Sequence, residues 1–261
     1  MTDWLAVCRG AVEDVRVVLA DLPTRAEREP VLGRGLGGDE TTAIDQAAED
    51  AILARFRDLD VTIVSEEAGR LGAGSTLVVV DPIDGSLNAK RGIPFFSLSL
   101  AIADGERMQD VFFAYVYDFG SGEEWIGRRG GGATVNGEPL GAVRPKERIE
   151  ILSFEATRTS LIAAQAPAVV ELAYRLRIMG SLALSLCHLA AGRVDAVCSL
   201  KPARSVDIAA AQLVVRERGL AIDLPDAPPF AAAPLDVEGR SRVVAAGTPE
   251  LCRRLAHALS T

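Results

Sequence analysis

A run of apolar, β-branched residues that ends abruptly in two carboxylates constrains this sequence more than any other segment. Residues 77–80 are typical of a buried strand, and residues 81–88 then read Asp-Pro-Ile-Asp-Gly-Ser-Leu-Asn. Pro82 fixes the backbone after the strand, and Gly85 permits a turn that a side chain would obstruct. The strand must therefore bring two acidic side chains to one point at the edge of a sheet.

Two carboxylates this close repel each other unless a cation lies between them. Oxygen ligands suit a hard ion such as Mg²⁺ or Mn²⁺, and the following Gly-Ser step would offer backbone N–H groups and a hydroxyl to an anion. The same residues also suit a tight turn in which the aspartates cap backbone amides. Taken alone, the segment leaves both interpretations open.

Histidine and cysteine are too scarce for several other kinds of active site. The chain has two histidines, and its four cysteines form no C-x-x-C pair. A histidine-based triad or a zinc site would need residues that the chain hardly has, so we expect His188 and His257 to be structural or exposed. The cysteines are typical of reduced core residues in a cytoplasmic protein. Any enzymatic chemistry is expected to depend on carboxylates.

Charge and hydropathy argue against several classes of partner. The net charge of −8 disfavours a nucleic acid bound through a broad basic face. No apolar run approaches the roughly 18 residues of a membrane span, and the N-terminal residues lack the pattern of a signal peptide. We therefore expect a cytoplasmic protein that binds neither nucleic acid nor membrane.

The apolar periodicity divides the chain into two parts. Residues 1–145 indicate an α+β subdomain, with helices at about 5–19 and 41–56 and then strands at 61–64, 77–80, 95–103, 111–117, 125–126 and 134–135. Residues 146–261 indicate an α/β subdomain, with strands at 149–154, 177–178, 194–199 and 242–245 and helices at 159–174, 181–191, 205–218 and 249–259. We expect the two subdomains to pack closely together.

A glycine-rich loop separates the first two predicted helices. Residues 28–39 carry four glycines in their last seven positions. A flexible hairpin tip and a mobile loop that closes over a ligand are both consistent with this composition.

Four segments resemble, in order, the motifs of the inositol monophosphatase family. They are T-A-I-D at 42–45, S-E-E at 65–67, the acidic segment at 81–88, and V-D-I-A-A at 206–210 with Glu217 and Gly219. Residues 177–181, Gly192 and Asp195 also match the family's substrate-side helix. The resemblance spans about residues 4–257, and the R-S-V-D run at 204–207 is closest to the archaeal branch that acts on both inositol phosphates and fructose 1,6-bisphosphate.

This resemblance implies a layered αβαβα sandwich of the sugar-phosphatase type. The family consists of Mg²⁺-dependent, lithium-sensitive phosphatases, so the implied function is hydrolysis of phosphate monoesters of small sugars or polyols. It also implies a homodimer and two or three Mg²⁺ ions in each active site, with Mn²⁺ as an alternative.

The resemblance further implies a role for each matching residue. The metal ligands would be Glu66, Asp81 and the Ile83 carbonyl for one ion, Asp81, Asp84 and Asp207 for a second, and Asp45 with Glu66 for a third. Glu66, Ser86 and Asp45 would be catalytic, with the Ser86 hydroxyl linked toward Asp45 and helping to take a proton from the attacking water. The residues implied to bind substrate are Asp84, Gly85, Ser86, Arg177, Gly180 and Ser181. Most of these metal ligands belong to the N-terminal subdomain.

The sequence departs from the family's pattern shortly before Asp207. The inositol-specific branch has a glutamate seven residues before this aspartate, where the chain has Leu200, followed by Lys201 and Arg204. A leucine cannot accept a hydrogen bond from a substrate hydroxyl, whereas a lysine and an arginine suit a second phosphate; they also suit a solvated loop. We expect bisphosphorylated sugars to be accepted at least as well as inositol monophosphate. Ser86 also differs, since the family usually has threonine there.

Two alternative functions fit the resemblance. One is a phosphatase acting on 3′-phosphoadenosine 5′-phosphate or NADP, although such branches usually carry longer adenine-binding insertions. The other is a non-catalytic homologue that binds a phosphorylated ligand or a protein. That alternative predicts gaps in the carboxylate set, and this sequence has none.

Overall fold

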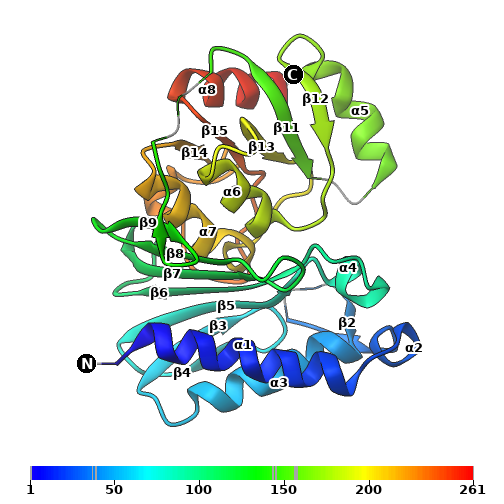
Figure 1. Ribbon diagram of the computed structural model, residues 1–261, viewed down its shortest axis with the longest axis vertical. Coiled ribbons are helices and arrows are strands. Elements are labelled where there is room, and N and C mark those ends of the chain that lie inside the picture. Colours follow the sequence, from blue (N-terminus) through cyan, green and yellow to red (C-terminus); the bar gives the residue numbers. More distant parts are fainter. Residues whose placement is uncertain are drawn as a thin grey trace.

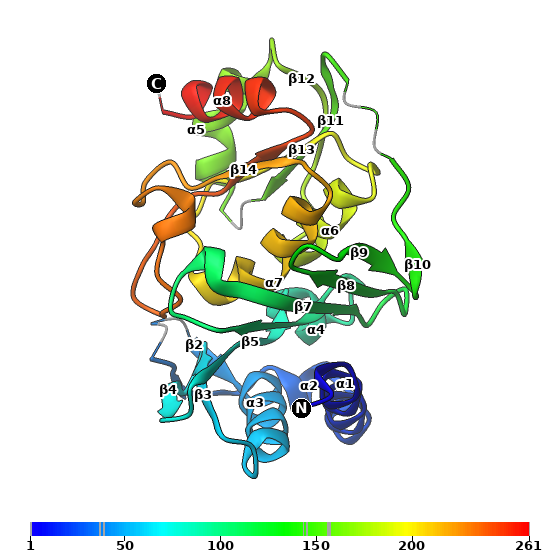
Figure 2. The same cartoon turned by 90° about the vertical axis from the view of Figure 1, so that its left-hand side faces the viewer.

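Two β-sheets alternate with three layers of helices in this protein. A computed structural model describes residues 2–36, 38, 40–142, 144, 146–155 and 158–260. Figure 2 shows the helical layers, which lie below, between and above the two sheets. The layers consist of α1 (Trp4–Asp21) with α3 (Ala43–Phe56), α6 (Leu182–Ala190) with α7 (Ser205–Glu217), and α5 (Thr159–Val169) with α8 (Pro249–Ala258). The expected αβαβα sandwich is confirmed.

The larger sheet has eight strands in the order β10-β9-β8-β7-β6-β5-β3-β4. These are β3 (Val61–Ser65), β4 (Gly69–Gly72), β5 (Thr76–Asp84), β6 (Ser97–Ala103), β7 (Val111–Asp118), β8 (Glu124–Arg128), β9 (Gly132–Val135) and β10 (Glu138–Pro139). All neighbours are antiparallel except β3 and β5, which run parallel. The carboxyl ends of β3 and β5 therefore meet at the same edge of the sheet.

The smaller sheet has five strands in the order β12-β11-β13-β15-β14. They are β11 (Ile149–Glu155), β12 (Ala173–Arg177), β13 (Ala196–Ser199), β14 (Ala221–Asp223) and β15 (Val244–Ala246). The prediction of a helix over 159–174 was wrong at its end, because Ala173 and Tyr174 belong to β12. This strand pairs in parallel with β11, with Ala173 opposite Ile149, and that long-range pairing decides the structure of a short segment of ambiguous periodicity.

Short elements complete the N-terminal part: α2 (Arg25–Arg28), the hairpin of β1 (Val31–Arg34) and β2 (Glu40–Thr42), and α4 (Ser86–Arg91). Figure 1 shows α2, β2 and α4 at one side of the larger sheet. Single 3₁₀ turns occur at Met108–Asp110 and Phe230–Ala232. Gly37 and Asp39 of the predicted mobile loop lie outside the described residues, so its closure over a ligand stays a prediction.

The largest apolar cluster lies between the two sheets and joins the two parts of the chain. It contains Val79 and Ala114 from the larger sheet, Leu213 and Val214 from α7, and Ala245 from the smaller sheet. Helix α7 thus packs on strands of the N-terminal part. The predicted boundary includes Pro145, which lies outside the described residues, and the division into two subdomains stays a prediction.

The scarce residues lie where the sequence predicts. All four cysteines are buried and free. His257 is exposed, and the half-buried His188 stacks on Phe95 and meets Trp125 edge to face. No helix in the described part of the chain combines the length and the apolar character needed to cross a membrane.

Candidate metal and phosphate site

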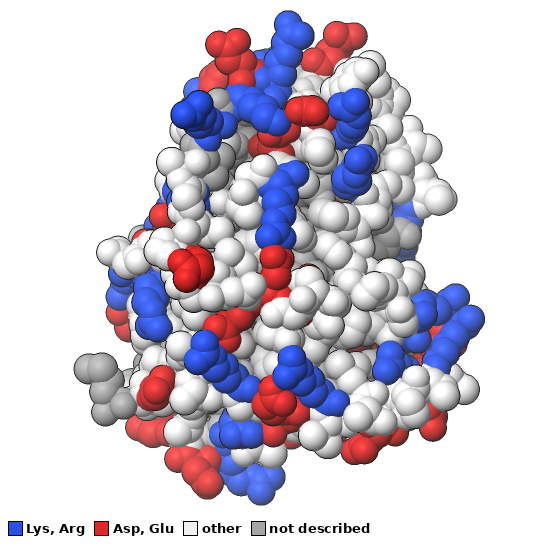
Figure 3. All heavy atoms as spheres, viewed as in Figure 1, with Lys and Arg blue, Asp and Glu red and all other residues white. Residues whose placement is uncertain are grey.

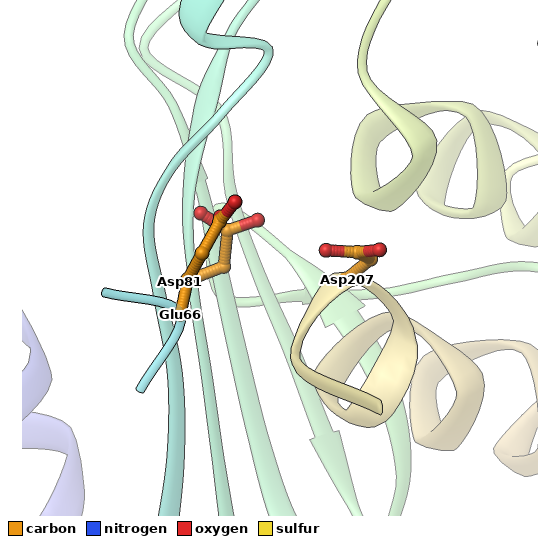
Figure 4. Close-up of side chains that lie close together, drawn as sticks. All are labelled: Glu66, Asp81 and Asp207. Carbon is orange, nitrogen blue, oxygen red and sulfur yellow. The ribbon is translucent and has the colours of Figure 1, made fainter. Parts of the chain in front are cut away.

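Three carboxylates converge where the parallel strands β3 and β5 end. Glu66 follows β3, Asp81 lies near the end of β5, and Asp207 lies in the first turn of α7. One oxygen atom from each lies within 4.8 Å of the others, and Figure 4 shows Asp207 facing the other two. The strand register places Ser65 opposite Val80, so the next residues, Glu66 and Asp81, emerge side by side. Helix α7 brings Asp207 to them from the other part of the chain.

Burial makes this concentration of negative charge costly. It raises the pKa of Glu66 to about 8 against the opposing effect of Arg204, and it raises the pKa of Asp84 to about 7 against the hydrogen bond from Ser181. Burial, and next the nearby Glu66, raise the pKa of Asp81 well above its usual value. Buried carboxylates in contact must be protonated or balanced by cations, which is the electrostatic character of a metal site.

Arg204 supplies positive charge directly to two of these carboxylates. Its Nη2 lies 2.5 Å from Glu66 Oε1 and 3.1 Å from Asp207 Oδ1, and its Nε donates to the same Asp207 oxygen at 3.2 Å. Its backbone N–H donates to the other oxygen, Asp207 Oδ2, at 2.7 Å. Arg204 is only 8% exposed. The guanidinium therefore faces the predicted metal ligands, and its contact with a second substrate phosphate stays a prediction.

Asp84 lies in the same pocket and is oriented by the start of α6. Its Oδ2 accepts hydrogen bonds from the Ser181 hydroxyl and from the Ala183 N–H at 2.8 Å, and Oδ1 accepts from the Leu182 N–H at 3.3 Å. Positive partial charge at a helix N-terminus favours a carboxylate there. Asp84 and Ser181, which both belong to the predicted site, are thus hydrogen-bonded to each other, and the start of α6 fixes the orientation of the Asp84 carboxylate.

The turn after β5 requires glycine for both conformation and space. Gly85 has a φ of 95°, and a Cβ there would lie 3.1 Å from the carbonyl oxygens of Gly180 and Phe95. Ser86 begins α4 and donates its hydroxyl to the Ile83 carbonyl at 3.0 Å. The predicted link from Ser86 to Asp45 is not among the hydrogen bonds of the described residues.

Asp45 offers an acceptor that protein groups do not satisfy. Its Oδ2 caps α3 by accepting from the N–H of Thr42 at 3.0 Å and from the Thr42 hydroxyl. Its Oδ1 is buried and has no hydrogen-bond partner within the described ranges, although Asp45 lines the same pocket as Glu66 and Asp81. A buried acceptor without a donor is rare and suits a cation. The all-oxygen donor set fits Mg²⁺ or Mn²⁺.

Comparison with known proteins agrees with this geometry. The sequence matches the inositol monophosphatase family over residues 6–261. The chain belongs to that family. A fructose-1,6-bisphosphatase/inositol-1-monophosphatase from Archaeoglobus fulgidus is 34% identical over 247 residues, which cover 94% of this chain and 93% of that protein. A Nus factor SuhB from Pasteurella multocida is 37% identical over 191 residues, 69% of this chain and 70% of that one.

A solved structure described as an inositol monophosphatase–fructose 1,6-bisphosphatase has the same fold. It aligns with a TM-score of 0.87 at 26% identity and covers 98% of this chain and 100% of that chain. The names of the relatives differ, so membership of the inositol monophosphatase family leaves the activity of this member to be argued from its own site.

Two buried glutamates that organise this site were not predicted from the sequence. Glu49 in α3 accepts from the Ser65 hydroxyl and from the N–H groups of Ala68 at 3.1 Å and Glu67 at 3.3 Å, which fixes the turn that carries Glu66. Its position one helical turn after Asp45 was the available signal.

The second such glutamate is Glu155, which lines the pocket at the end of β11. It accepts from the Gly180 N–H at 2.8 Å and from the hydroxyls of Ser153 at 2.7 Å and Ser185 at 2.8 Å. It therefore orients the segment before α6. An acid that ends an apolar strand is the same signal that singled out Asp81.

The predicted substrate-side residues of this family member occupy different surroundings. Gly180, Lys201 and Arg204 line the pocket, which has a volume of about 310 Å³, together with Lys90 and Arg240, which the sequence analysis missed. In the view of Figure 3, acidic side chains lie near the middle of the surface, and basic side chains lie above and below them.

Two positions that the sequence analysis linked to substrate recognition, Arg177 and Leu200, do not line the pocket. Arg177 is exposed at the end of β12, where it donates to the Leu176 carbonyl at 2.8 Å. Leu200 is buried in an apolar cluster with residues of β11 and α8. Its side chain contributes to the core, which explains why a leucine is tolerated at this position.

Proposed function

We propose that this protein is a Mg²⁺-dependent phosphatase of phosphate monoesters of small sugars or polyols. The observation that carries the proposal is the convergence of Glu66, Asp81 and Asp207 beside the Gly85–Ser86 turn in one pocket. Relatives named for action on inositol phosphate and fructose 1,6-bisphosphate support the same substrate class.

In this proposal, each residue of the pocket has a role as a metal ligand, a phosphate-binding group or a proton-transfer group. Glu66, Asp81 and the Ile83 carbonyl would hold one ion, Asp81, Asp84 and Asp207 would hold a second, and Asp45 with Glu66 would hold a third. When bound, such ions supply Lewis-acid chemistry that acidifies water and stabilises negative charge on phosphoryl oxygens. The backbone N–H groups of Gly85 and Ser86 orient the phosphate, and the Ser86 hydroxyl helps to move the proton of the attacking water.

Basic residues around the pocket support bisphosphorylated sugars as substrates, accepted at least as well as inositol monophosphate. Lys201 and Arg240 line the same pocket as Asp207, so a second phosphate would meet positive charge. The side chain of Leu200 is buried and offers no acceptor for a substrate hydroxyl. From the family resemblance we also propose a homodimer, and the free, buried cysteines support a cytoplasmic location.

A phosphate-release assay with Mg²⁺ and the variant Asp207→Asn tests this function. We expect the wild-type protein to hydrolyse inositol monophosphate or fructose 1,6-bisphosphate. The variant should lose more kcat than the roughly 10–100-fold cost of removing an outer-shell partner of a metal. The matched control is Asp226→Asn, which removes a carboxylate that pairs with Arg242 outside the pocket. Circular dichroism verifies that both variants fold.

The same assay separates the alternatives. Near-normal turnover by folded Asp207→Asn would refute the metal assignment. Hydrolysis only of 3′-phosphoadenosine 5′-phosphate or NADP would favour the nucleotide phosphatase. An absence of turnover on every substrate, with Mg²⁺ bound, would favour the non-catalytic homologue.

A further inference from the structure

Arg204 places a positive charge on the same oxygens that the proposed function assigns to metal ions. Its Nη2 contacts Glu66 Oε1 at 2.5 Å and Asp207 Oδ1 at 3.1 Å. The side chains of Glu66 and Asp207 are only 15% and 16% exposed, so solvent screens these contacts weakly. The guanidinium is therefore a strong counter-ion for two of the three converging carboxylates.

A metal ion and this guanidinium cannot both hold these oxygens favourably. Mg²⁺ lies about 2.0–2.1 Å from its oxygen ligands. An ion on Glu66 Oε1 would then lie less than about 5 Å from the Arg204 nitrogen, and like charges at that separation in a buried site repel strongly. The two cations therefore compete for these oxygens.

When the guanidinium of Arg204 leaves, Asp207 loses its two side-chain contacts on Oδ1 but keeps a backbone hydrogen bond on Oδ2. The backbone N–H of Arg204 donates to Asp207 Oδ2 at 2.7 Å, and this bond does not depend on the guanidinium. The arginine itself lines the pocket of about 310 Å³, together with Lys201 and Arg240. A guanidinium that turns away from the carboxylates would enter the space that the substrate phosphate is proposed to occupy.

We propose that Arg204 is an exchangeable counter-ion, which competes with Mg²⁺ for Glu66 and Asp207 and is released toward a phosphate when the metal binds. The inference rests on the proposed metal-dependent function. It explains how one residue serves both states of the site, because its charge balances the carboxylates first and a phosphate afterwards. Metal binding and phosphate binding are thereby coupled through one side chain.

Isothermal titration calorimetry of EDTA-treated, dialysed protein tests the competition. We expect Arg204→Gln to bind Mg²⁺ at least ten-fold more tightly than the wild type, because no guanidinium must be displaced. In saturating Mg²⁺, the same variant should bind inorganic phosphate at least several-fold more weakly. Arg204→Lys keeps the charge with a single nitrogen donor, so its Mg²⁺ affinity should lie between the two.

Thermal melts supply a second readout. In EDTA, Arg204→Gln should melt below the wild type, and saturating Mg²⁺ should close most of that gap. The matched control is Arg242→Gln, which breaks the ion pair with Asp226 outside the pocket. Its deficit should be the same with and without Mg²⁺.

The possible outcomes are distinguishable. Weaker or unchanged Mg²⁺ binding by Arg204→Gln, or by Arg204→Lys if the glutamine variant does not fold, would overturn the competition while leaving the metal site intact. Unchanged phosphate binding would overturn the release toward substrate. No Mg²⁺ binding by the wild type would refute the proposed metal site itself, and the inference with it.

Discussion

At the scale of single residues, Glu66 shows how a structural cost becomes a functional property. Burial disfavours its charged form, and the neighbouring Asp207 and Glu67 add to that effect, whereas Arg204 offsets part of it. A bound divalent cation would compensate the buried negative charge. Relief of this unfavourable electrostatic free energy would therefore favour metal binding. Asp45 Oδ1, which has no hydrogen-bond partner among the described residues, illustrates the same principle at the pocket wall.

The stability of EDTA-treated protein should fall as the pH rises from about 5 to about 8. Glu66 has a pKa of about 8 in the folded chain against a usual 4.5, and Asp84 about 7 against 3.8. Because these values are raised by folding, their stabilising contribution is complete below the unfolded values and is lost as the pH rises through the folded ones. Saturating Mg²⁺ should oppose the loss, since metal binding requires deprotonated ligands.

Thermal melts at about pH 5 and about pH 8 measure this effect. The matched variant is Glu66→Gln, which is uncharged at both pH values and should therefore lose less stability between them than the wild type. An equal or greater loss in the variant would contradict the role given to Glu66.

At the scale of elements, the site depends on how helices hold the ends of strands. Helix α3 contributes Asp45 to the pocket and Glu49 to the turn after β3, one helical turn apart. The start of α6 orients Asp84, and the start of α7 carries Asp207. Strands β3 and β5 supply the remaining carboxylates in a register that places them side by side.

Replacing Glu49 should therefore damage both stability and metal binding. Glu49→Ala leaves the buried Ser65 hydroxyl and the Ala68 N–H without their acceptor. We expect a loss of about 2 kcal/mol in the free energy of unfolding, measured by urea denaturation, and weaker Mg²⁺ binding. Glu49→Gln keeps an acceptor oxygen and is the control. Equal losses in the two variants would show that side-chain volume, not hydrogen bonding, decides the effect.

At the scale of the whole molecule, one apolar cluster joins the two sheets. Residues of α6 and α7 pack against β5, β6 and β7, while β13 and β15 close the cluster from the other side. The site lies where the two parts of the chain meet, because Asp207 belongs to the C-terminal part and Glu66 and Asp81 belong to the N-terminal part. Displacement of α7 from the larger sheet would therefore also separate Asp207 from Glu66 and Asp81.

The two parts of the chain should unfold together. Because Val79 of the larger sheet and Ala245 of the smaller sheet belong to the same cluster, neither sheet keeps its apolar face covered without the other. Differential scanning calorimetry should give one transition, with calorimetric and van't Hoff enthalpies that agree. Two resolved transitions, or a van't Hoff enthalpy well below the calorimetric one, would instead indicate independent subdomains.

The sequence by itself determined the features that depend on neighbours along the chain. The apolar strand before Asp81, the glycine required at the following turn, the long amphipathic helices and the ordered family motifs are all local patterns, readable because backbone sterics and side-chain periodicity act over a few residues. The resemblance of these motifs to those of the inositol monophosphatase family then implied the layered fold and the grouping of Glu66, Asp81 and Asp207.

Only the tertiary structure decided the features that depend on partners far away in the chain. Pairing with β11 makes residues 173–174 a strand, and packing against β11 and α8 buries Leu200. Arg204 contacts Asp207 three residues further along the chain, and the meeting of α7 with the end of β3 also brings its guanidinium to Glu66. Such contacts arise from burial and charge compensation between segments that no local pattern relates, so the residue expected to face a phosphate was found balancing Glu66 and Asp207.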